Sequence, residues 1–109
     1  MTDKIVVLST CSSEDEARRI AADLINNQLA ACVNLVPQIR SIYRWQGAIE
    51  DSPEILLIVK SSRALFDRVR EAIGRLHSYD VPEVIALPIV DGAASYLQWM
   101  DTELAREGD

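Results

Sequence analysis

The longest regular pattern in the chain is an alternation of apolar and polar residues between Ala31 and Gly47. The apolar positions are Ala31, Val33, Leu35, Ile39, Tyr43 and Trp45, and the polar ones between them include Asn34, Gln38, Arg40 and Arg44. This period of two predicts one long strand, about 55 Å if fully extended. A domain of this size has a radius of gyration of only about 13 Å, so part of the strand should project beyond its own core. Pro37, which lacks a backbone donor, predicts a kink or bulge within it.

Three further aliphatic runs predict shorter strands, at residues 4–10, 54–60 and 83–90. Turn-forming residues at 46–53, including Gly47 and Pro53, predict a loop between the long strand and run 54–60. Run 54–60 has five consecutive apolar residues and is therefore apolar on both faces. A helix layer covers only one face, so we expect a second subunit to cover the other.

Three stretches have the apolar spacing of helices. The first begins at a capping box, in which the Ser13 hydroxyl accepts from the Glu16 amide and the Glu16 side chain reaches back. The second is capped by Ser61 or Ser62 and ends around residues 77–80, and the third follows residues 91–92, with fraying expected at 107–109. The apolar positions are Ala17, Ile20, Ala21, Leu24 and Ile25 in the first; Leu65, Phe66, Val69, Ala72, Ile73 and Leu76 in the second; Ala93, Tyr96, Leu97, Met100 and Leu104 in the third.

The predicted order is β-α-β-β-α-β followed by a C-terminal helix. This is the split βαβ arrangement of the α+β ferredoxin-like fold, in which right-handed crossovers put both main helices on one face of the sheet. No linker, low-complexity segment or residue-level repeat divides the chain, so residues 1–109 are expected to form a single domain.

Composition is that of an ordinary globular domain, with 49% hydrophobic and 26% charged residues. The formal net charge of −6 opposes the electrostatic term that drives most nucleic-acid binding, so DNA and RNA are poor candidates. No apolar run is long enough to cross a membrane and no secretory signal pattern opens the chain, which predicts a cytoplasmic protein. The two cysteines form no Cys-x-x-Cys motif and predict neither a disulfide framework nor a zinc knuckle.

Other functions of this fold lack their signatures here. A heavy-metal transfer domain needs two thiolates after the first strand, where only Cys11 is found. A ferredoxin-like RNA binder needs surface aromatic residues on a basic strand, and run 54–60 is aliphatic. A phosphatase needs an anion-binding loop, and residues 10–13 are followed by three acids. No catalytic triad or carboxylate pair emerges from the spacing, and the chain has one histidine, so we expect no enzyme.

Aromatic and charged residues remain at strand ends and loop junctions, where side chains could converge. For Tyr43 and Trp45, subunit packing competes with ligand contact. For His77, a helix-end cap competes with metal ligation. Lys60 and Glu83 could simply form a salt bridge. The whole set is Tyr43, Trp45, Lys60, His77, Tyr79, Glu83 and Trp99.

Five segments together resemble the CutA family of divalent-cation-tolerance proteins: residues 29–34, 41–47, 58–60, 77–83 and 96–99. The resemblance implies a ferredoxin-like subunit, a homotrimer built through long strands as in the PII signalling proteins, copper binding and no established catalytic activity. The family's cluster at the subunit junction corresponds to Trp45, Lys60, His77, Tyr79 and Glu83. This sequence departs from the family in having Ser78 where proline is usual. It also has Ser9 where some members have cysteine, so ligation by that cysteine is not transferred.

Two hypotheses follow. The first is a homotrimeric metal-responsive protein that requires no cofactor and binds Cu²⁺ or another divalent cation, with His77 as the leading ligand and Cys32 as a weaker thiolate candidate. The second is a PII-like signalling or scaffold trimer that binds a small metabolite or a protein partner in an inter-subunit cleft. The cleft residues are Tyr43, Trp45, Lys60, Tyr79, Glu83 and Trp99, and Lys60 would suit an anionic group.

Overall fold

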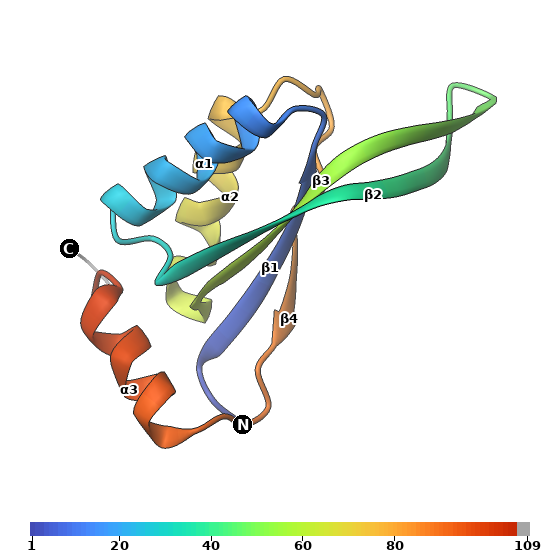
Figure 1. Cartoon of the computed structure of the whole chain (residues 1–109). Coiled ribbons are helices and arrows are strands. Elements are labelled where there is room, and N and C mark those ends of the chain that lie inside the picture. Colours follow the sequence, from blue (N-terminus) through green and yellow to red (C-terminus); the bar gives the residue numbers. More distant parts are fainter. Residues whose placement is uncertain (107–109) are drawn as a thin grey trace.

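The computed structural model describes residues 1–106, which form a four-stranded antiparallel sheet and three α-helices. The strands are β1 (Lys4–Cys11), β2 (Cys32–Trp45), β3 (Ala48–Ser62) and β4 (Ile85–Pro88), in the sheet order β2-β3-β1-β4. The helices are α1 (Glu14–Asn26), α2 (Phe66–Leu76), which follows a 3₁₀ turn at Arg63–Leu65, and α3 (Ala94–Glu103). Figure 1 shows α1 and α2 side by side on one side of the sheet and α3 apart from them. The predicted α+β ferredoxin-like fold with an extra C-terminal helix is confirmed. The expected fraying of 107–109 lies outside the described residues.

The core lies between the helices and one face of the sheet. On β1 and β3, alternate residues such as Val7 and Val59 are fully buried and directly paired across the strands. They pack with the apolar stripes of the helices, including Ile20 and Ile73. Ser9 lies on the same face of β1, and its hydroxyl is the one buried side-chain polar atom without a hydrogen-bond partner among residues 1–106.

The other face of the sheet carries apolar side chains that α1 and α2 do not cover (Figure 1), and α3 contacts this face at Lys60 and Lys4. Leu56 and Ile58 alternate along β3 with the buried Leu57 and Val59 and stay half-buried, as does Leu8 on β1. The prediction that run 54–60 is apolar on both faces is therefore confirmed. Burial of this second face would need contacts from outside residues 1–106.

The β2–β3 hairpin extends well beyond the core as a two-stranded arm (Figure 1). A bulge between Val36 and Ile39 confirms the predicted irregularity at Pro37, and Gln38 has a positive φ of 64° there. The predicted loop at 46–53 is wrong, because β3 already begins at Ala48. Gln46 and Gly47 make the turn alone, with φ values of 50° and 82° that suit a tight hairpin.

The helices lie where they were predicted, but some of their side chains differ from the prediction in their contacts or their burial. Ser13 caps α1 by accepting from the Glu16 amide at 3.2 Å, as predicted. The Glu16 side chain does not return to Ser13, and it contacts Ser78 instead. Ile25 was expected in the apolar stripe but is 42% exposed, since it lies at the edge of the helix away from the sheet.

Two further boundaries differ from expectation. Ser62 precedes the 3₁₀ turn without a side-chain cap, and the Ser61 hydroxyl donates to the Leu29 carbonyl at 2.6 Å. The fourth strand is shorter than the predicted run 83–90: it pairs with β1 through Ile85–Pro88, and the Ile89 N–H still donates to the Lys4 carbonyl at 3.0 Å. In α3, Met100 and Leu104 are buried as predicted, whereas Tyr96 is exposed.

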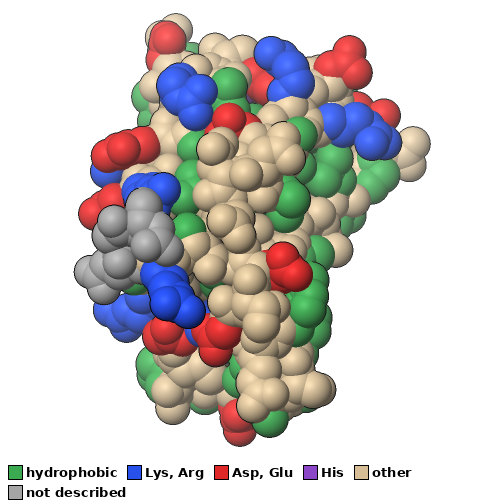
Figure 2. All heavy atoms as spheres, turned by 90° about the vertical axis from the view of Figure 1, so that its left-hand side faces the viewer, with side chains coloured by type: hydrophobic (Ala, Val, Ile, Leu, Met, Phe, Trp, Pro, Cys, Tyr) green, Lys and Arg blue, Asp and Glu red, His purple; other side chains and the backbone are tan. Residues whose placement is uncertain are grey.

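The helix-covered side of the molecule carries intermixed basic and acidic side chains rather than a field of one sign (Figure 2). One basic group forms two ion pairs. Lys4 is buried, and its Nζ lies 2.6 Å from both Asp3 and Asp101, so the second pair connects β1 with α3. Burial alone would lower the pKa of Lys4, but the hydrogen bonds to Asp101 and Asp3 outweigh it and raise the pKa. None of the described helices is long and apolar enough to span a membrane.

Candidate functional site

The single histidine lies directly after α2 and turns its ring toward β1. The His77 N–H still bonds the Ile73 carbonyl, so the residue ends the helix, but its ring is not a dipole cap. Nε2 lies 2.7 Å from the Thr10 carbonyl, which can only accept, so Nε2 carries the hydrogen. Nδ1 then accepts the Tyr79 N–H at 3.0 Å. Both nitrogens of the neutral imidazole are thus hydrogen-bonded, and the ring is fully buried.

Glu16 supplies a buried carboxylate beside this ring. Its two oxygens accept from the Ser78 N–H at 2.7 Å and from the Ser78 hydroxyl at 3.3 Å, and Oε2 lies 4.0 Å from His77 Nδ1. A proline in place of Ser78 would have neither the N–H nor the hydroxyl. The serine that departs from the family pattern therefore provides both hydrogen bonds that hold this carboxylate.

Cys11 completes the group on the other edge of the ring, with Sγ 3.9 Å from His77 Nε2. We call Cys11, Glu16 and His77 the His77 cluster, since one ligand atom of each lies within 4.8 Å of the others. Burial raises the pKa of the Cys11 thiol to about 11, and the negative charges of Glu16 and Glu54 add to the effect. The thiol is therefore neutral near pH 7.

The order thiol, imidazole, carboxylate resembles the arrangement that activates a nucleophile. The hydrogen on His77 Nε2 points at the Thr10 carbonyl, so this nitrogen cannot accept the thiol proton. With a raised thiol pKa as well, the His77 cluster has no activated nucleophile.

The donor atoms of the His77 cluster suit a borderline or soft metal, because sulfur and imidazole nitrogen favour copper and zinc over magnesium and calcium. Tetrahedral zinc with bonds of about 2.0–2.3 Å separates its ligand atoms by roughly 3.5 Å. The 3.9 Å between Cys11 Sγ and His77 Nε2 is close to that value. The residues fit such an ion, provided that the thiol gives up its proton and the imidazole proton moves from Nε2 to Nδ1, where the bond from the Tyr79 N–H would be lost.

Cys32, the thiolate suggested by the sequence, is far from His77. It begins β2 and pairs with Lys60, which pairs in turn with Val6 on β1. Val6 and Cys11 are five residues apart on that strand, about 16 Å, and alternate residues place them on opposite faces. Within one chain, a single ion cannot contact both Cys32 and His77.

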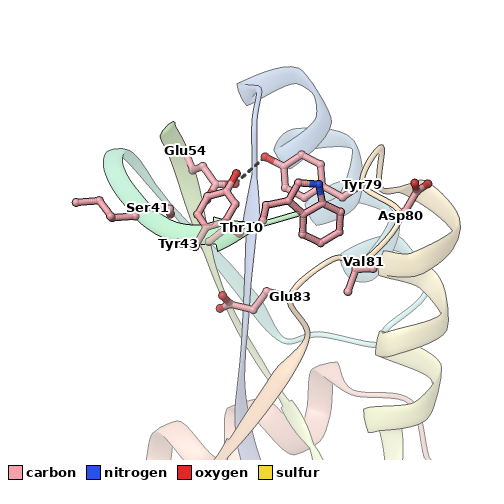
Figure 3. Close-up of a pocket in the computed structure, with 10 residues that line it drawn as sticks. Thr10, Ser41, Tyr43, Glu54, Tyr79, Asp80, Val81 and Glu83 are labelled. Carbon is pink, nitrogen blue, oxygen red and sulfur yellow. Dashed lines mark hydrogen bonds between the residues drawn. The ribbon is translucent and has the colours of Figure 1, made fainter. Parts of the chain in front are cut away.

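A pocket of about 580 Å³ lies between the arm and the segment that follows His77 (Figure 3). We call it the arm pocket, and its lining residues are Thr10, Ser41, Ile42, Tyr43, Trp45, Glu54, Tyr79, Asp80, Val81 and Glu83. Four of the six predicted cleft residues line it: Tyr43, Trp45, Tyr79 and Glu83. In Figure 3, Glu54 and Glu83 lie on the Tyr43 side of the pocket, and Asp80 lies on the opposite side.

The other two predicted cleft residues, Lys60 and Trp99, belong to a separate group beside α3. Lys60 Nζ lies 5.8 Å from the centre of the Tyr96 ring, and that ring lies 5.4 Å from Trp99. Neither residue lines the arm pocket. Within one chain, the six predicted cleft residues therefore lie in two separate groups.

Glu54 is one of two acids of the arm pocket that sequence reasoning missed, the other being Asp80. The side chain of Glu54 is buried, and Oε2 accepts the Tyr79 hydroxyl at 2.7 Å. Burial and this hydrogen bond to a carboxylate raise the pKa of Tyr79. In the sequence, Glu54 is an acid directly before the aliphatic residues 55–59. This pattern is equally typical of an ordinary strand end and did not indicate a site.

Comparison with known proteins decides the family. The family model described as "CutA1 divalent ion tolerance protein" matches residues 5–103. This chain belongs to the CutA1 family. It is 50% identical over 95 residues to the divalent-cation tolerance protein CutA of Thermus thermophilus, covering 87% of this chain and 92% of that one. It is 45% identical over 91 residues to human protein CutA, covering 84% of this chain but only 51% of the human protein.

Solved CutA1 structures have the same fold. The Thermus thermophilus protein superimposes with a TM-score of 0.91 at 46% identity, over 94% of this chain and 99% of that chain. CutA from Xylella fastidiosa gives a TM-score of 0.93 at 36% identity, over 95% and 100%. The names of CutA relatives include chloroplastic proteins and a periplasmic one, so membership of the family does not determine a compartment. The family is named for tolerance of divalent ions, not for a reaction.

Proposed function

We propose that this CutA1 protein is a homotrimeric, non-enzymatic divalent-cation-tolerance protein that binds copper or another divalent metal at the His77 cluster. The observation that carries the proposal is the buried convergence of a thiol, an imidazole and a carboxylate within 4.8 Å. His77 keeps the leading role that the sequence suggested. The thiolate role moves from Cys32 to Cys11, which lies beside the ring.

Metal uptake at this place is coupled to proton release. Nε2 of His77 would exchange its hydrogen bond to Thr10 for a metal bond as the ring proton moves to Nδ1, and Cys11 would bind as thiolate. Because burial keeps the Cys11 thiol protonated, affinity should rise with pH. The bound ion would supply positive charge to a buried site that already holds the Glu16 carboxylate.

Native mass spectrometry of the full chain, with and without Cu²⁺ or Zn²⁺, tests both parts of the proposal. We expect the mass of three chains and one ion per chain. Cys11→Ser and His77→Ala should each lose the ion, and Cys32→Ser is the matched control that should keep it. Zinc, which has no redox chemistry, separates metal binding from thiol oxidation by copper. Unchanged zinc stoichiometry and affinity in His77→Ala would contradict the assignment.

Assembly is supported by the apolar face of the sheet that α1 and α2 do not cover and by the projecting arm. Leu8, Leu56 and Ile58 are only half-buried on that face, and Ile42 and Ile49 are about 70% exposed on the arm. Surfaces of this kind are typical of subunit interfaces. A monomeric mass at micromolar concentration would refute the trimer.

The arm pocket favours a second candidate, a PII-like scaffold that binds a small molecule or a protein partner. Lys60 does not line the pocket, so a single chain offers no basic group to an anion there. For the compartment, the cytoplasm stays our proposal, and cell fractionation with a compartment marker tests it.

A further inference from the structure

The arm pocket is acidic and has no basic counterpart in its wall. Glu54, Asp80 and Glu83 contribute three carboxylates, and none of its ten lining residues is Lys, Arg or His. An anionic ligand would therefore enter against repulsion, whereas a cation would be attracted.

The carboxylate of Glu54 belongs to a buried residue that lines the pocket. The residue is 5% exposed, and its one hydrogen bond within residues 1–106 joins Oε2 to the Tyr79 hydroxyl. Oε1 receives no donor from the described chain, and it is not one of its fully buried polar atoms. It therefore meets the solvent of the pocket, where it can accept from the N–H or O–H group of a ligand.

Aromatic rings form much of the remaining wall. Tyr43 and Trp45 are 43% and 46% exposed, and Tyr79 stands between the pocket and His77. Aromatic faces attract ammonium groups and also pack against methylene chains. The side chains in Figure 3 surround a space that a flexible aliphatic chain can enter.

We propose that the arm pocket binds an aliphatic diamine or polyamine in its protonated form. One ammonium group donates to Oε1 of Glu54, a second pairs with Glu83, and the methylene chain between them lies against Tyr43 and Trp45. A quaternary ammonium ion has no N–H for Glu54. A bare metal ion would leave the aromatic wall without a role. This site shares no residue with the His77 cluster, and the proposal rests on the second candidate function above, for which it names the class of ligand.

Isothermal titration calorimetry of the full chain with 1,4-diaminobutane and with spermidine tests this assignment. Both amines should bind, and uncharged 1,4-butanediol should not. Binding should weaken as salt is added, since exposed charges are screened. Glu54→Gln keeps the shape of the side chain and should weaken binding about tenfold or more, as expected for a lost hydrogen bond between charged groups. Glu83→Gln should weaken it about threefold, in the range of a partly exposed ion pair.

Glu50→Gln is the matched control, because it removes the same charge from the arm outside the pocket lining and should change affinity less than about twofold. Thermal unfolding of each variant shows that it is folded. Cys11→Ser should retain amine binding even if it loses metal, which separates this proposal from the previous one. Equal binding of Mg²⁺ in place of the amines would overturn the proposal. So would an equal effect of Glu50→Gln, or no binding at all because a basic side chain of a second copy already fills the pocket.

Discussion

Residues 77–80 contribute to both the His77 cluster and the arm pocket. The two places differ in how many of their polar side-chain atoms have hydrogen-bond partners within the chain. In the cluster, both imidazole nitrogens and both Glu16 oxygens have partners within the chain. In the pocket, Glu54 has a partner for one oxygen, and the other carboxylates face open space. The closed group must lose the Cys11 thiol proton and the hydrogen bonds of the His77 ring before it accepts an ion. The open group needs no such rearrangement to accept a cation.

The same short segment serves both places. Ser78 bonds the carboxylate of Glu16, and Tyr79 bonds His77 through its backbone and Glu54 through its hydroxyl. The difference between the two groups therefore comes from their surroundings: helices enclose one, and the arm borders the other. Burial, rather than residue type, determines which of these polar groups is available to a ligand.

Removal of the Glu16 carboxylate is the strongest test of the closed cluster. Glu16→Ala should reduce the free energy of unfolding by about 2 kcal/mol, because the Ser78 N–H loses its acceptor in a partly buried site. Urea unfolding measures the change. Glu14→Ala removes an exposed acid from the same first turn and should cost less than about 1 kcal/mol. Equal effects would mean that Glu16 acts only through the helix dipole.

Alkaline pH should open the cluster through Cys11. Its thiol is fully buried and burial raises its pKa to about 11, against the ordinary 9.0. A group with a raised folded pKa favours the folded state below its unfolded pKa and loses that contribution as pH rises. Stability should fall by about 2–3 kcal/mol between pH 9 and 11, by order of magnitude.

Urea unfolding across this pH range should show a shallower loss for Cys11→Ser than for the native chain. Cys32→Ser is the control and should keep the native slope. Lys4 and Tyr79 also have raised pKa values, so part of the alkaline loss will remain in every variant. A slope in Cys11→Ser identical to the native one would show that the thiol does not titrate with unfolding.

Ser9 and Ser61 allow a comparison between a buried hydroxyl that lacks a hydrogen-bond partner and one that has a partner. Both hydroxyls are buried, but Ser61 donates to the Leu29 carbonyl and Ser9 has no partner in residues 1–106. Ser61→Ala should lower the free energy of unfolding by about 1 kcal/mol. Ser9→Ala should leave it unchanged or raise it by up to about 1 kcal/mol, since an unpaired buried hydroxyl is removed. Equal losses in thermal or urea unfolding would show that Ser9 is bonded in solution.

The smallest effect is expected on the arm. Arg40 and Asp51 form an exposed ion pair at 2.9 Å near the pocket. Arg40→Gln should change the free energy of unfolding by less than about 0.5 kcal/mol. A large loss in urea unfolding would show that the arm is energetically part of the closed core.

The fold could be predicted because its signals are local and repetitive. The period-two pattern of β2 and the helical spacing in α1 and α2 each point to one structure, and their order leaves few topologies. The hairpin was predicted too short at the β3 side, since Pro53 and its acidic neighbours resemble a loop. Those residues extend as strand because the Gln46–Gly47 turn already reverses the chain.

The sites were harder to predict because they depend on contacts distant in sequence. The spacing of Glu16 suggested a reciprocal cap, yet its carboxylate bonds Ser78, which lies 62 residues away. The sequence pattern gave Cys11 no role as a ligand, and the structure places its Sγ 3.9 Å from His77 Nε2. The aromatic members of the arm pocket could be named from their types and strand positions, but Glu54 had no signal to distinguish it from other strand-end acids.

The shape of the arm also bears on whether the single chain aggregates in solution. A long two-stranded ribbon exposes unpaired backbone groups along β2, and such edges promote aggregation. Here Pro37 withholds a donor, the neighbouring bulge interrupts the ladder, and the charges of Arg40 and Arg44 stand along the edge. Free strands of other proteins would find only short stretches of this edge to pair with. The irregularity at Pro37 therefore limits edge pairing where the arm leaves the core.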